Sequence, residues 1–320
     1  MGYYLNHDLL FASAFIPEHE PEEGEIYPTE IVIPNKITYN GVTYSVDFFD
    51  LSFDNEGAME YVTFRGPLPV QKNYHRRNLR KVTVEAGIFS LNMGFSHYTA
   101  LEEVVFEDPK DMERAGLYFY DCPKLKDIYI PADVDILPRV RQCPNADIIF
   151  APDHPKYMVV DGDIYSKDGK ILYDVPKGKK NYKVKKLVKE IGVYAFYGNG
   201  DIRHIRVPSS VKKIAAYAFG NMENLKSVKL SKNLKIAEDH LLARSTKLKT
   251  ITYPKKIRII QGSFGRKYGC RLKKMYIKAE KLKKIKVNGL PKTRTIYVKN
   301  QLVKKQVRDA GFNGKIIVDP

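Results

Sequence analysis

The sequence predicts a mainly β solenoid built from units of about 23 residues, whose strands form a parallel ladder. The main observation is a short phrase that recurs along the chain: apolar, two variable residues, apolar, one variable residue, apolar. Well-matched successive copies begin 22 to 24 residues apart, which is too regular for chance. One such unit cannot bury its own apolar face, so neighbouring units must stack to bury a continuous core.

The strand phrase recurs from residue 59 onwards. The first, fourth and sixth residues of each copy are expected to point inward, and the residues between them to face solvent or a partner. The copies are Met59–Phe64, Leu79–Val84, Leu101–Phe106, Leu125–Ile130, a degenerate Ala146–Phe150, Ile202–Val207, Leu225–Leu230, Leu248–Tyr253, Leu272–Ile277 and Thr293–Val298.

A second phrase lies between the copies of the first. It is clearest at Val188–Phe196 and Val211–Phe219, where each copy ends in Ala-Phe, and weaker versions begin at Leu234, Ile257 and Leu282. The Ala lets two backbones approach closely, and the Phe supplies a large buried area. Each unit is therefore predicted to contain a strand, a turn, a short second strand and a closing loop.

Both ends of the chain are predicted to cap the solenoid. At the N-terminus, Ile31–Val46 reads as an edge hairpin that turns at Asn40-Gly41, a strong hairpin signal. At the C-terminus, Lys299–Phe312 reads as a short amphipathic helix with Gly311 as its stop, followed by a last strand from Lys315. A further hairpin, Val159–Gly178, is expected to interrupt the array and to turn at Asp168-Gly169.

These elements divide one continuous solenoid into five parts. Residues 1–58 form the N-terminal hairpin and cap region, residues 59–154 form divergent acidic repeats, and residues 155–180 form the inserted hairpin. Residues 181–298 form regular basic repeats, and residues 299–320 form the C-terminal cap. The sequence leaves the number of repeats open in the divergent stretch 65–150.

The segment VKEIGVYAFYGNGDIRHIRVPS at Val188–Ser209, and the similar VKKIAAYAFGNMENLKSVKL from Val211, resemble the BspA-like leucine-rich repeats of Bacteroidetes surface proteins, which also occur in trichomonads and treponemes. The resemblance spans about residues 25–320, and it departs in residues 65–150, where the Ile-Gly pair is missing. Cys122, Cys143 and Cys270 stand where the family's repeat cysteine stands, which implies buried thiols. The resemblance further implies a cell-surface or secreted protein whose partners are host matrix proteins, other bacteria or glycans.

Charge is distributed unevenly along the chain. Residues 1–150 contain 13 Lys or Arg and 24 Asp or Glu, a formal charge of −11, whereas residues 151–320 contain 41 and 13, a formal charge of +28. This asymmetry points to an anionic partner for the second half, with a solvated lysine-rich surface as the alternative. No apolar run is long enough for a transmembrane segment. Residues 1–14 lack the signal-peptide pattern, so the protein is either cytoplasmic or exported by a signal outside this sequence.

Catalytic, metal and cofactor motifs are not found in the sequence, and an enzyme is the weakest interpretation. The three cysteines are odd in number and far apart, which favours buried free thiols over a disulfide framework. The acidic run Glu18–Glu25 lacks calcium-loop spacing and is expected to be an exposed loop. Asp161-Gly162-Asp163 and Asp168 also hint at calcium, but hairpin turns explain them better.

The candidate binding site is the outward face of the strand ladder in the second half. Second and fifth residues of each phrase form two adjacent columns there, and in the first half the same positions hold Arg80, Glu102 and Lys126, and Thr83, Val105 and Tyr129. Like charges on neighbouring strands repel, so a solenoid that retains them in succession is expected to use them. The candidate residues are Arg203, Arg206, Lys226, Lys229, Lys249, Lys273, Tyr276, Arg294 and Tyr297.

The sequence thus favours a non-catalytic adhesion or protein-binding module, which presents this face to a host or bacterial macromolecule, expected to be a protein or an acidic glycan. Two alternatives remain open: a ligand-free structural or self-assembly domain, in which an acidic half meets a basic half head to tail, and a non-specific binder of acidic polysaccharide. Specific nucleic-acid binding is not expected, since no nucleic-acid recognition motif is present. The ligand, the export route and the oligomeric state stay open.

Overall fold

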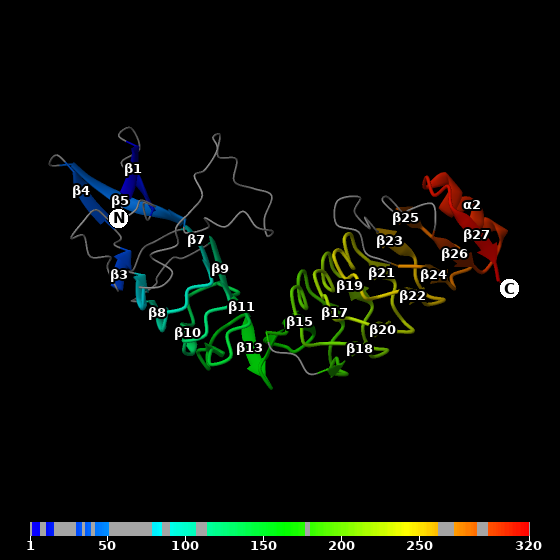
Figure 1. Ribbon diagram of the computed structural model, residues 1–320, viewed down its shortest axis with the longest axis horizontal. Helices are drawn as coiled ribbons and strands as arrows, with labels where there is room; N and C mark the ends of the chain where they lie inside the picture. The colour runs from blue at the N-terminus through cyan, green and yellow to red at the C-terminus, as the bar shows by residue number, and fades with distance from the viewer. Residues whose placement is uncertain are drawn as a thin grey trace. The chain divides into compact units, whose positions relative to one another are not determined.

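The structure is a computed structural model, and it shows a mainly β protein (Figure 1). It describes residues 2–6, 11–15, 30–33, 36–39, 42–50, 79–84, 90–106, 114–176, 180–261, 272–286 and 294–319. The chain divides into two compact units, Met1–Lys156 and Tyr157–Pro320. The five-part division of the sequence, with its finer boundaries, stays a prediction.

The first unit contains three β-sheets. The largest sheet has the order β1-β2-β5-β7-β9-β11, with β4 paired to β5, and the smaller sheets are β3-β6-β8 and β10-β12. The strands are β1 (Gly2–Asn6), β2 (Phe11–Phe15), β3 (Glu30–Ile33), β4 (Lys36–Tyr39), β5 (Val42–Asp50), β6 (Lys81–Val84), β7 (Ser90–Ser96), β8 (Glu103–Phe106), β9 (Arg114–Tyr120), β10 (Ile128–Ile130), β11 (Arg139–Arg141) and β12 (Ile148–Phe150).

The second unit is a regular solenoid with two parallel ladders. Short second strands continue the inserted hairpins as β13-β14-β15-β17-β19-β21-β23-β25, and the strand phrases form β16-β18-β20 and β22-β24-β26-β27. The elements are β13 (Tyr157–Val160), β14 (Asp163–Ser166), β15 (Ile171–Asp174), β16 (Asn181–Lys183), β17 (Glu190–Ile191), β18 (His204–Arg206), β19 (Lys213–Ile214), β20 (Ser227–Lys229), β21 (Ile236–Ala237), β22 (Thr250–Tyr253), β23 (Ile259–Gln261), β24 (Lys274–Ile277), β25 (Lys284–Lys286), β26 (Thr295–Val298), α2 (Gln301–Asp309) and β27 (Lys315–Val318).

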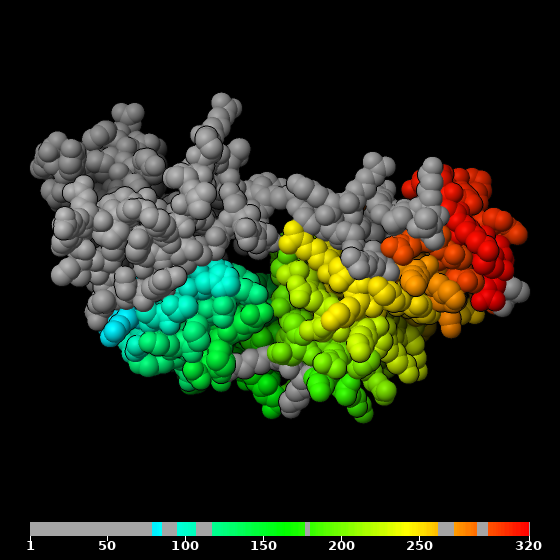
Figure 2. Space-filling view, in the orientation of Figure 1, coloured from blue at the N-terminus to red at the C-terminus, as the bar shows by residue number. Residues whose placement is uncertain are grey.

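The register of the parallel strands confirms the predicted period. Glu190 lies opposite Lys213, and Lys213 lies opposite Ile236, so these two steps along the ladder are each 23 residues. In the first unit Lys81 lies opposite Glu103, a step of 22 residues. Because the register repeats, equivalent side chains of successive units stack in columns. In the space-filling view, successive repeats form adjacent stripes on the surface of the second compact unit, Tyr157–Pro320 (Figure 2).

The apolar positions of the strand phrase point inward, as predicted. In the copy at Ile202–Val207, the exposed fractions of Ile202, Ile205 and Val207 are 0%, 2% and 4%. The Ala-Phe pair of the second phrase is also buried, and the rings of Phe196 and Phe219 lie 5.4 Å apart. Stacked units therefore bury one continuous core in the second unit, since each apolar column meets the next.

The predicted hairpins are present. Strands β4 and β5 pair antiparallel with Tyr39 opposite Val42, on either side of Asn40-Gly41. Strands β14 and β15 also pair antiparallel, and Gly169 between them has a φ of +70°. A second turn joins β13 to β14 at Asp161-Gly162, which agrees with the hairpin-turn interpretation of these residues. The inserted segment is therefore a three-stranded meander, and its last strand continues into the solenoid by pairing with β17.

The C-terminal cap is the predicted helix and strand. The side chain of Asn300 accepts a hydrogen bond from the Val303 amide and so caps the first turn of α2. Gly311 has a φ of +91°, the left-handed conformation with which helices commonly end. Val303 and Val307 are buried against the solenoid, whereas Leu302 is exposed. Strand β27 then adds to the edge of β26 in parallel.

Among the residues that the structure describes, no helix is long and apolar enough to cross a membrane.

Candidate functional site

The candidate site lies along the strand-phrase ladder of the second unit. The cations at its second positions occupy successive units, and backbone hydrogen bonds join two of these steps: Lys226 N–H donates to Arg203 O at 2.8 Å, and Lys273 N–H donates to Lys249 O at 2.7 Å. Between them the strands divide into two sheets, β16-β18-β20 and β22-β24-β26-β27. The amide of Arg203 likewise donates to Lys180 O at 2.8 Å, so the column begins one unit earlier than predicted.

The fifth positions form the second predicted column. Lys183, Arg206 and Lys229 occupy successive register positions in β16, β18 and β20. Lys183 was not among the predicted residues, although it follows Lys180 by three positions as Arg206 follows Arg203. Farther along, this column changes character from cationic to aromatic, because Tyr276 lies opposite Tyr297.

The side chains of Tyr276 and Tyr297 pack directly against each other. The rings of Tyr276 and Tyr297 stack with centroids 4.5 Å apart and an interplanar angle of 13°. The ammonium group of Lys274 lies 5.9 Å from the centre of the Tyr297 ring, within the range of a cation–π contact. Both rings are half-buried, and so is Arg294 at the same end of the ladder. This end is consequently less accessible than the sequence suggested.

The remaining predicted cations are exposed, and within the described residues none of them forms an ion pair. They are Arg203, Arg206, Lys226, Lys229, Lys249 and Lys273. Lys249 bonds only to a backbone carbonyl, that of Thr246, at 2.9 Å. Between the two columns His204 and Ser227 share a hydrogen bond of 2.8 Å. The structure therefore brings six exposed, uncompensated cations together on one ladder face.

The matching face of the first unit has a different character. Thr83 is buried, Val105 is half-buried, and Tyr129 lies opposite Ile149 with exposed fractions of 53% and 43%. Lys126 is compensated by ion pairs with Glu103 at 3.1 Å and Glu102 at 3.6 Å. The basic column is therefore a property of the second unit among the described residues.

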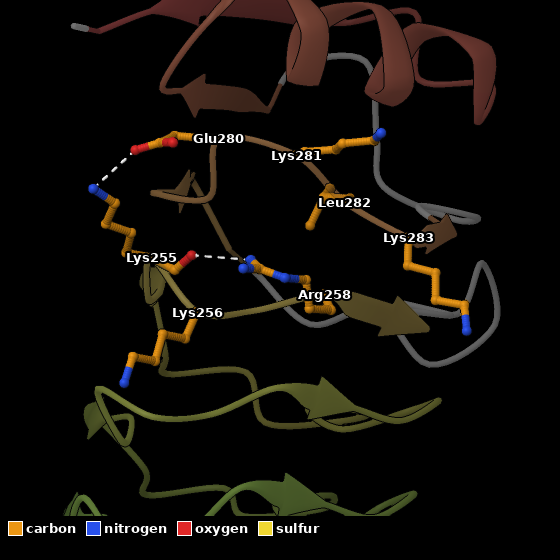
Figure 3. Close-up of a pocket in the computed structure, with 7 residues that line it drawn as sticks. All are labelled: Lys255, Lys256, Arg258, Glu280, Lys281, Leu282 and Lys283. Atoms are coloured by element: carbon orange, nitrogen blue, oxygen red, sulfur yellow. Dashed lines mark hydrogen bonds and ion pairs between the residues drawn. The ribbon is translucent and has the colours of Figure 1, made fainter.

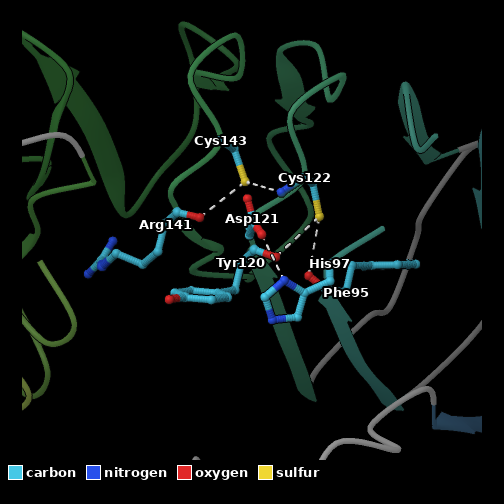
Figure 4. Close-up of polar contacts among 7 residues, drawn as sticks. All are labelled: Phe95, His97, Tyr120, Asp121, Cys122, Arg141 and Cys143. Atoms are coloured by element: carbon cyan, nitrogen blue, oxygen red, sulfur yellow. Dashed lines mark hydrogen bonds and ion pairs between the residues drawn. The ribbon is translucent and has the colours of Figure 1, made fainter. Parts of the chain in front are cut away.

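The cysteines were predicted to be buried thiols, and this is confirmed for Cys122 and Cys143 (Figure 4). The Cys122 amide donates to Cys143 Sγ at 3.4 Å, and the Cys122 thiol donates to the Phe95 carbonyl at 3.3 Å. The hydrogen bond with Cys143, together with burial, raises the pKa of the Cys122 thiol. A protonated, buried thiol is a poor nucleophile, which applies to Cys122. The same hydrogen bond lowers the pKa of the Cys143 thiol, which is buried beside it. Cys270 lies outside the described residues.

The aspartates considered as calcium ligands lie in the inserted meander. Asp161 and Asp168 sit in hairpin turns, as the alternative reading predicted, and Asp168 accepts hydrogen bonds from Ser166 Oγ at 2.7 Å and from the Lys170 amide at 3.0 Å. Asp163 points inward and accepts hydrogen bonds from the hydroxyls of Tyr165 and Tyr182. Burial raises the pKa of Asp163 to about 6. The acidic run Glu18–Glu25 lies outside the described residues.

Comparison with known proteins supports the repeat assignment. A BspA type leucine rich repeat region matches residues 178–296 in six copies. A leucine-rich repeat protein from Eubacterium ventriosum is 19% identical over 76% of this chain and 67% of its own, with a TM-score of 0.50. The pneumococcal vaccine antigen PcpA is 15% identical over 100% of this chain and 99% of its own, with a TM-score of 0.49.

A leucine-rich repeat protein from Bacteroides capillosus is 26% identical over 38% of this chain and 98% of its own, with a TM-score of 0.33. No curated protein matches the chain. The structural likeness to the Eubacterium protein shows the fold, and the match over residues 178–296 shows the type of repeat. Residues 178–296 are therefore similar to a leucine rich repeat region of the BspA type, and the chain has the fold of a leucine-rich-repeat protein.

Proposed function

We propose that the protein is a non-catalytic binding module of the cell surface or of secreted proteins, and that the ladder face of its second unit holds an acidic region of a partner protein. The family suggests protein binding in general terms. The observation that carries the proposal is the set of exposed cations at Arg203, Lys226, Lys249 and Lys273, which lack ion pairs within the described residues.

Electrostatic repulsion within this column destabilises the fold, and an acidic partner can offset it. Parallel neighbouring strands lie about 4.7–4.9 Å apart, so cations in successive units repel one another. Like charges placed opposite each other in a sheet destabilise it by an amount on the order of 0.2–1 kcal/mol per pair. An acidic partner relieves this repulsion and also reaches the surface faster, because the aligned charges steer it.

The half-buried tyrosines at the C-terminal end of the ladder add a second element. Tyrosine supplies rigid contact area and a hydroxyl at low entropic cost, and tyrosine is enriched in protein interfaces. In this proposal the stacked Tyr276 and Tyr297 form the apolar end of the face, and the cations from Arg203 to Lys273 form its polar part. A rigid pair of aromatic rings surrounded by charged side chains suits a protein partner.

The test is binding to an array of immobilised host matrix proteins, with two variants of equal charge. The first variant replaces Arg203, Lys226 and Lys249 by Gln. The second variant also introduces Gln, at Lys212, Lys235 and Arg258, which precede the short second strands of the solenoid. We expect selective binding that the first variant loses by at least about tenfold, a change of about 1.4 kcal/mol, and that the second retains. Equal binding by both variants and the wild type would refute the assignment of the site.

Self-assembly is the second candidate, and the charge asymmetry of the chain favours it. The acidic residues 1–150 of one copy and the basic residues 151–320 of another have complementary formal charges of −11 and +28. Sedimentation at low and at high salt distinguishes the candidates. Oligomers that dissociate as salt rises support assembly, and a monomer that is insensitive to salt excludes it.

A further inference from the structure

A second column of cations, which the sequence analysis did not single out, runs along the ladder of short strands β17-β19-β21-β23-β25. Each member precedes its strand, and the amide of each member after the first donates to the carbonyl of the member before it at 2.8 Å. All five side chains are exposed. We call this column the second ladder, and its members are Lys189, Lys212, Lys235, Arg258 and Lys283.

The second ladder is uncompensated, although the fold compensates a lysine in the neighbouring column. Lys213 lies one residue beyond Lys212, and its ammonium group bridges Glu190 at 2.9 Å and Glu238 at 3.2 Å. Within the described part of the chain, no member of the second ladder has an ion pair. The same sheet therefore pairs Lys213 with its own acids and leaves the cations of the adjacent column without ion pairs among the described residues.

A hollow of about 550 Å³ lies at the C-terminal end of the second ladder (Figure 3). Arg258 and Lys283 line it together with Lys255, Lys256, Lys281, Leu282 and Glu280. Five of the seven lining side chains, including Arg258, are cations. The one carboxylate of the lining, Glu280, forms an ion pair with Lys255 at 2.8 Å. The hollow is consequently a strongly cationic pocket that opens onto the ladder.

A change in the repeat lies beside the hollow. Val188, Val211, Leu234 and Ile257 follow one another at intervals of 23 residues, but Leu282 follows Ile257 after 25. Tyr253 lies opposite Ile277, a step of 24, so one of the two extra residues falls in the segment between Ile277 and Leu282. Gln306 of α2 holds Leu282 by two hydrogen bonds, from the Leu282 amide at 3.0 Å and to the Leu282 carbonyl at 2.7 Å.

We infer that the second ladder and this hollow bind a linear sulfated polysaccharide. The inference goes beyond the proposed protein-binding face, because it assigns a different set of side chains and a different class of partner. Five cations at strand spacing form a row about 19 Å long. A polymer with a uniform repeat of anionic groups can neutralise such a row at every step, whereas the charges of a folded protein are irregular.

The chemistry of the row also favours this partner. Four of its five members are lysines, whose compact ammonium groups bind sulfate oxygens as point charges without requiring the paired geometry of a carboxylate. The adjacent column of the same sheet presents Glu190, Lys213, Ile236 and Ile259 rather than aromatic rings. Single-stranded nucleic acid would require such rings for base stacking. A protein partner would require an apolar or aromatic anchor at the centre.

The experiment measures binding of the full chain to heparin oligosaccharides at several salt concentrations. The matched variants are those described above: Lys212, Lys235 and Arg258 to Gln in the second ladder, and Arg203, Lys226 and Lys249 to Gln in the ladder face. We expect the second-ladder variant to bind at least about tenfold more weakly, with a salt slope reduced by about three, roughly one per removed cation. The ladder-face variant should bind within about threefold of the wild type.

Equal weakening in both variants would overturn the inference, since it would show that net charge alone governs binding. Wild-type affinity in the second-ladder variant would overturn it too, and so would equal affinity for desulfated heparin, polyglutamate or single-stranded DNA. The protein array tests the other face, so the two proposals can fail separately.

The hollow provides an independent variant. Glu280→Gln removes the carboxylate that occupies Lys255 and leaves the lining cations free, so we expect heparin to bind about twofold to fivefold more tightly, by roughly 0.4–1 kcal/mol. Unchanged or weaker heparin binding by Glu280→Gln would exclude the hollow from the site. Circular dichroism of each variant checks that the fold is retained.

Discussion

The buried carboxyl of Asp163 makes the stability of the second unit depend on pH in a predictable direction. Burial raises its pKa from the model-compound value of 3.8 to about 6, although hydrogen bonds from Tyr182 and Tyr165 and the charge of Lys185 oppose the rise. The nearby carboxyl of Asp174, which is also buried, raises it further. A difference of about two pKa units corresponds to about 3 kcal/mol between the two protonation states.

The sign follows from proton binding. Because the pKa is higher in the folded than in the unfolded state, the folded protein holds the proton more tightly, and the stabilisation is complete below pH 4. It is lost as the pH rises from about 4 through about 6, and ionised Asp163 destabilises the folded protein at neutral pH. Asp163→Asn removes the ionisation, so at pH 7.5 we expect the variant to be more stable by about 1–3 kcal/mol.

Urea unfolding of the full chain between pH 4.5 and pH 8, followed by circular dichroism, measures this effect as the difference between the variant and the wild type. Asp168→Asn in the same meander is the control. Hydrogen bonds from Lys170 and Ser166 lower the pKa of Asp168 to about 2, so its stabilisation is present at neutral pH and lost as the pH falls toward 2. Asp168→Asn should therefore destabilise the protein at pH 7.5. Parallel pH profiles for Asp163→Asn and the wild type would refute the reasoning.

Three further predictions concern the core, the thiols and the cap. Phe219→Ala removes a fully buried ring and should cost about 3–5 kcal/mol in urea unfolding, while Phe219→Leu should cost far less; similar values for the two would argue against tight packing. In a Cys270→Ser variant, the remaining thiols should react with a thiol reagent only after unfolding, because Cys122 and Cys143 are buried; rapid reaction in the native protein would contradict this. Asn300→Ala removes the cap of α2 and should cost about 1 kcal/mol, seen as faster amide exchange at Val303; unchanged exchange there would show that the cap is dispensable.

Much of the fold was predictable because the information repeats along the chain. The inward positions of the strand phrase follow from the spacing of apolar residues within each copy, and their stacking follows from the interval between copies. Ile202, Ile205 and Val207 illustrate this, since the phrase predicted all three to be buried and all three are. The C-terminal helix was predictable from local signals, namely the spacing of Val303 and Val307 and the position of Gly311.

The candidate face was only partly predictable. The second and fifth positions flank inward residues, so the exposure of Arg203, Lys226 and Lys249 followed from the phrase. Arg294, Tyr276 and Tyr297 occupy equivalent positions but are half-buried, because the stacking of the two rings depends on contacts between units. The domain division and the role of the face stay predictions.

The second ladder carried a signal that the sequence analysis did not use. Lysines recur at every third residue from Lys180 to Lys189 and again from Lys226 to Lys235, which places one cation in each of several columns. The sequence could not show which columns are neutralised. Lys213 is compensated because Glu190 and Glu238 come from the units on either side of it, whereas Lys212 meets only Lys189 and Lys235.

The sequence by itself determined the repeat, the buried positions and the total charge of each half, because these depend on residues close together in the chain. The tertiary structure decided which charges are paired, where the hollow opens and how the tyrosines stack. The interval of 25 residues before Leu282 is visible in the sequence, but only the folded chain shows that Leu282 lines a hollow and bonds to Gln306, 24 residues away. Coulomb and hydrogen-bond energies depend on distances between atoms of neighbouring units, and only the folded chain sets those distances.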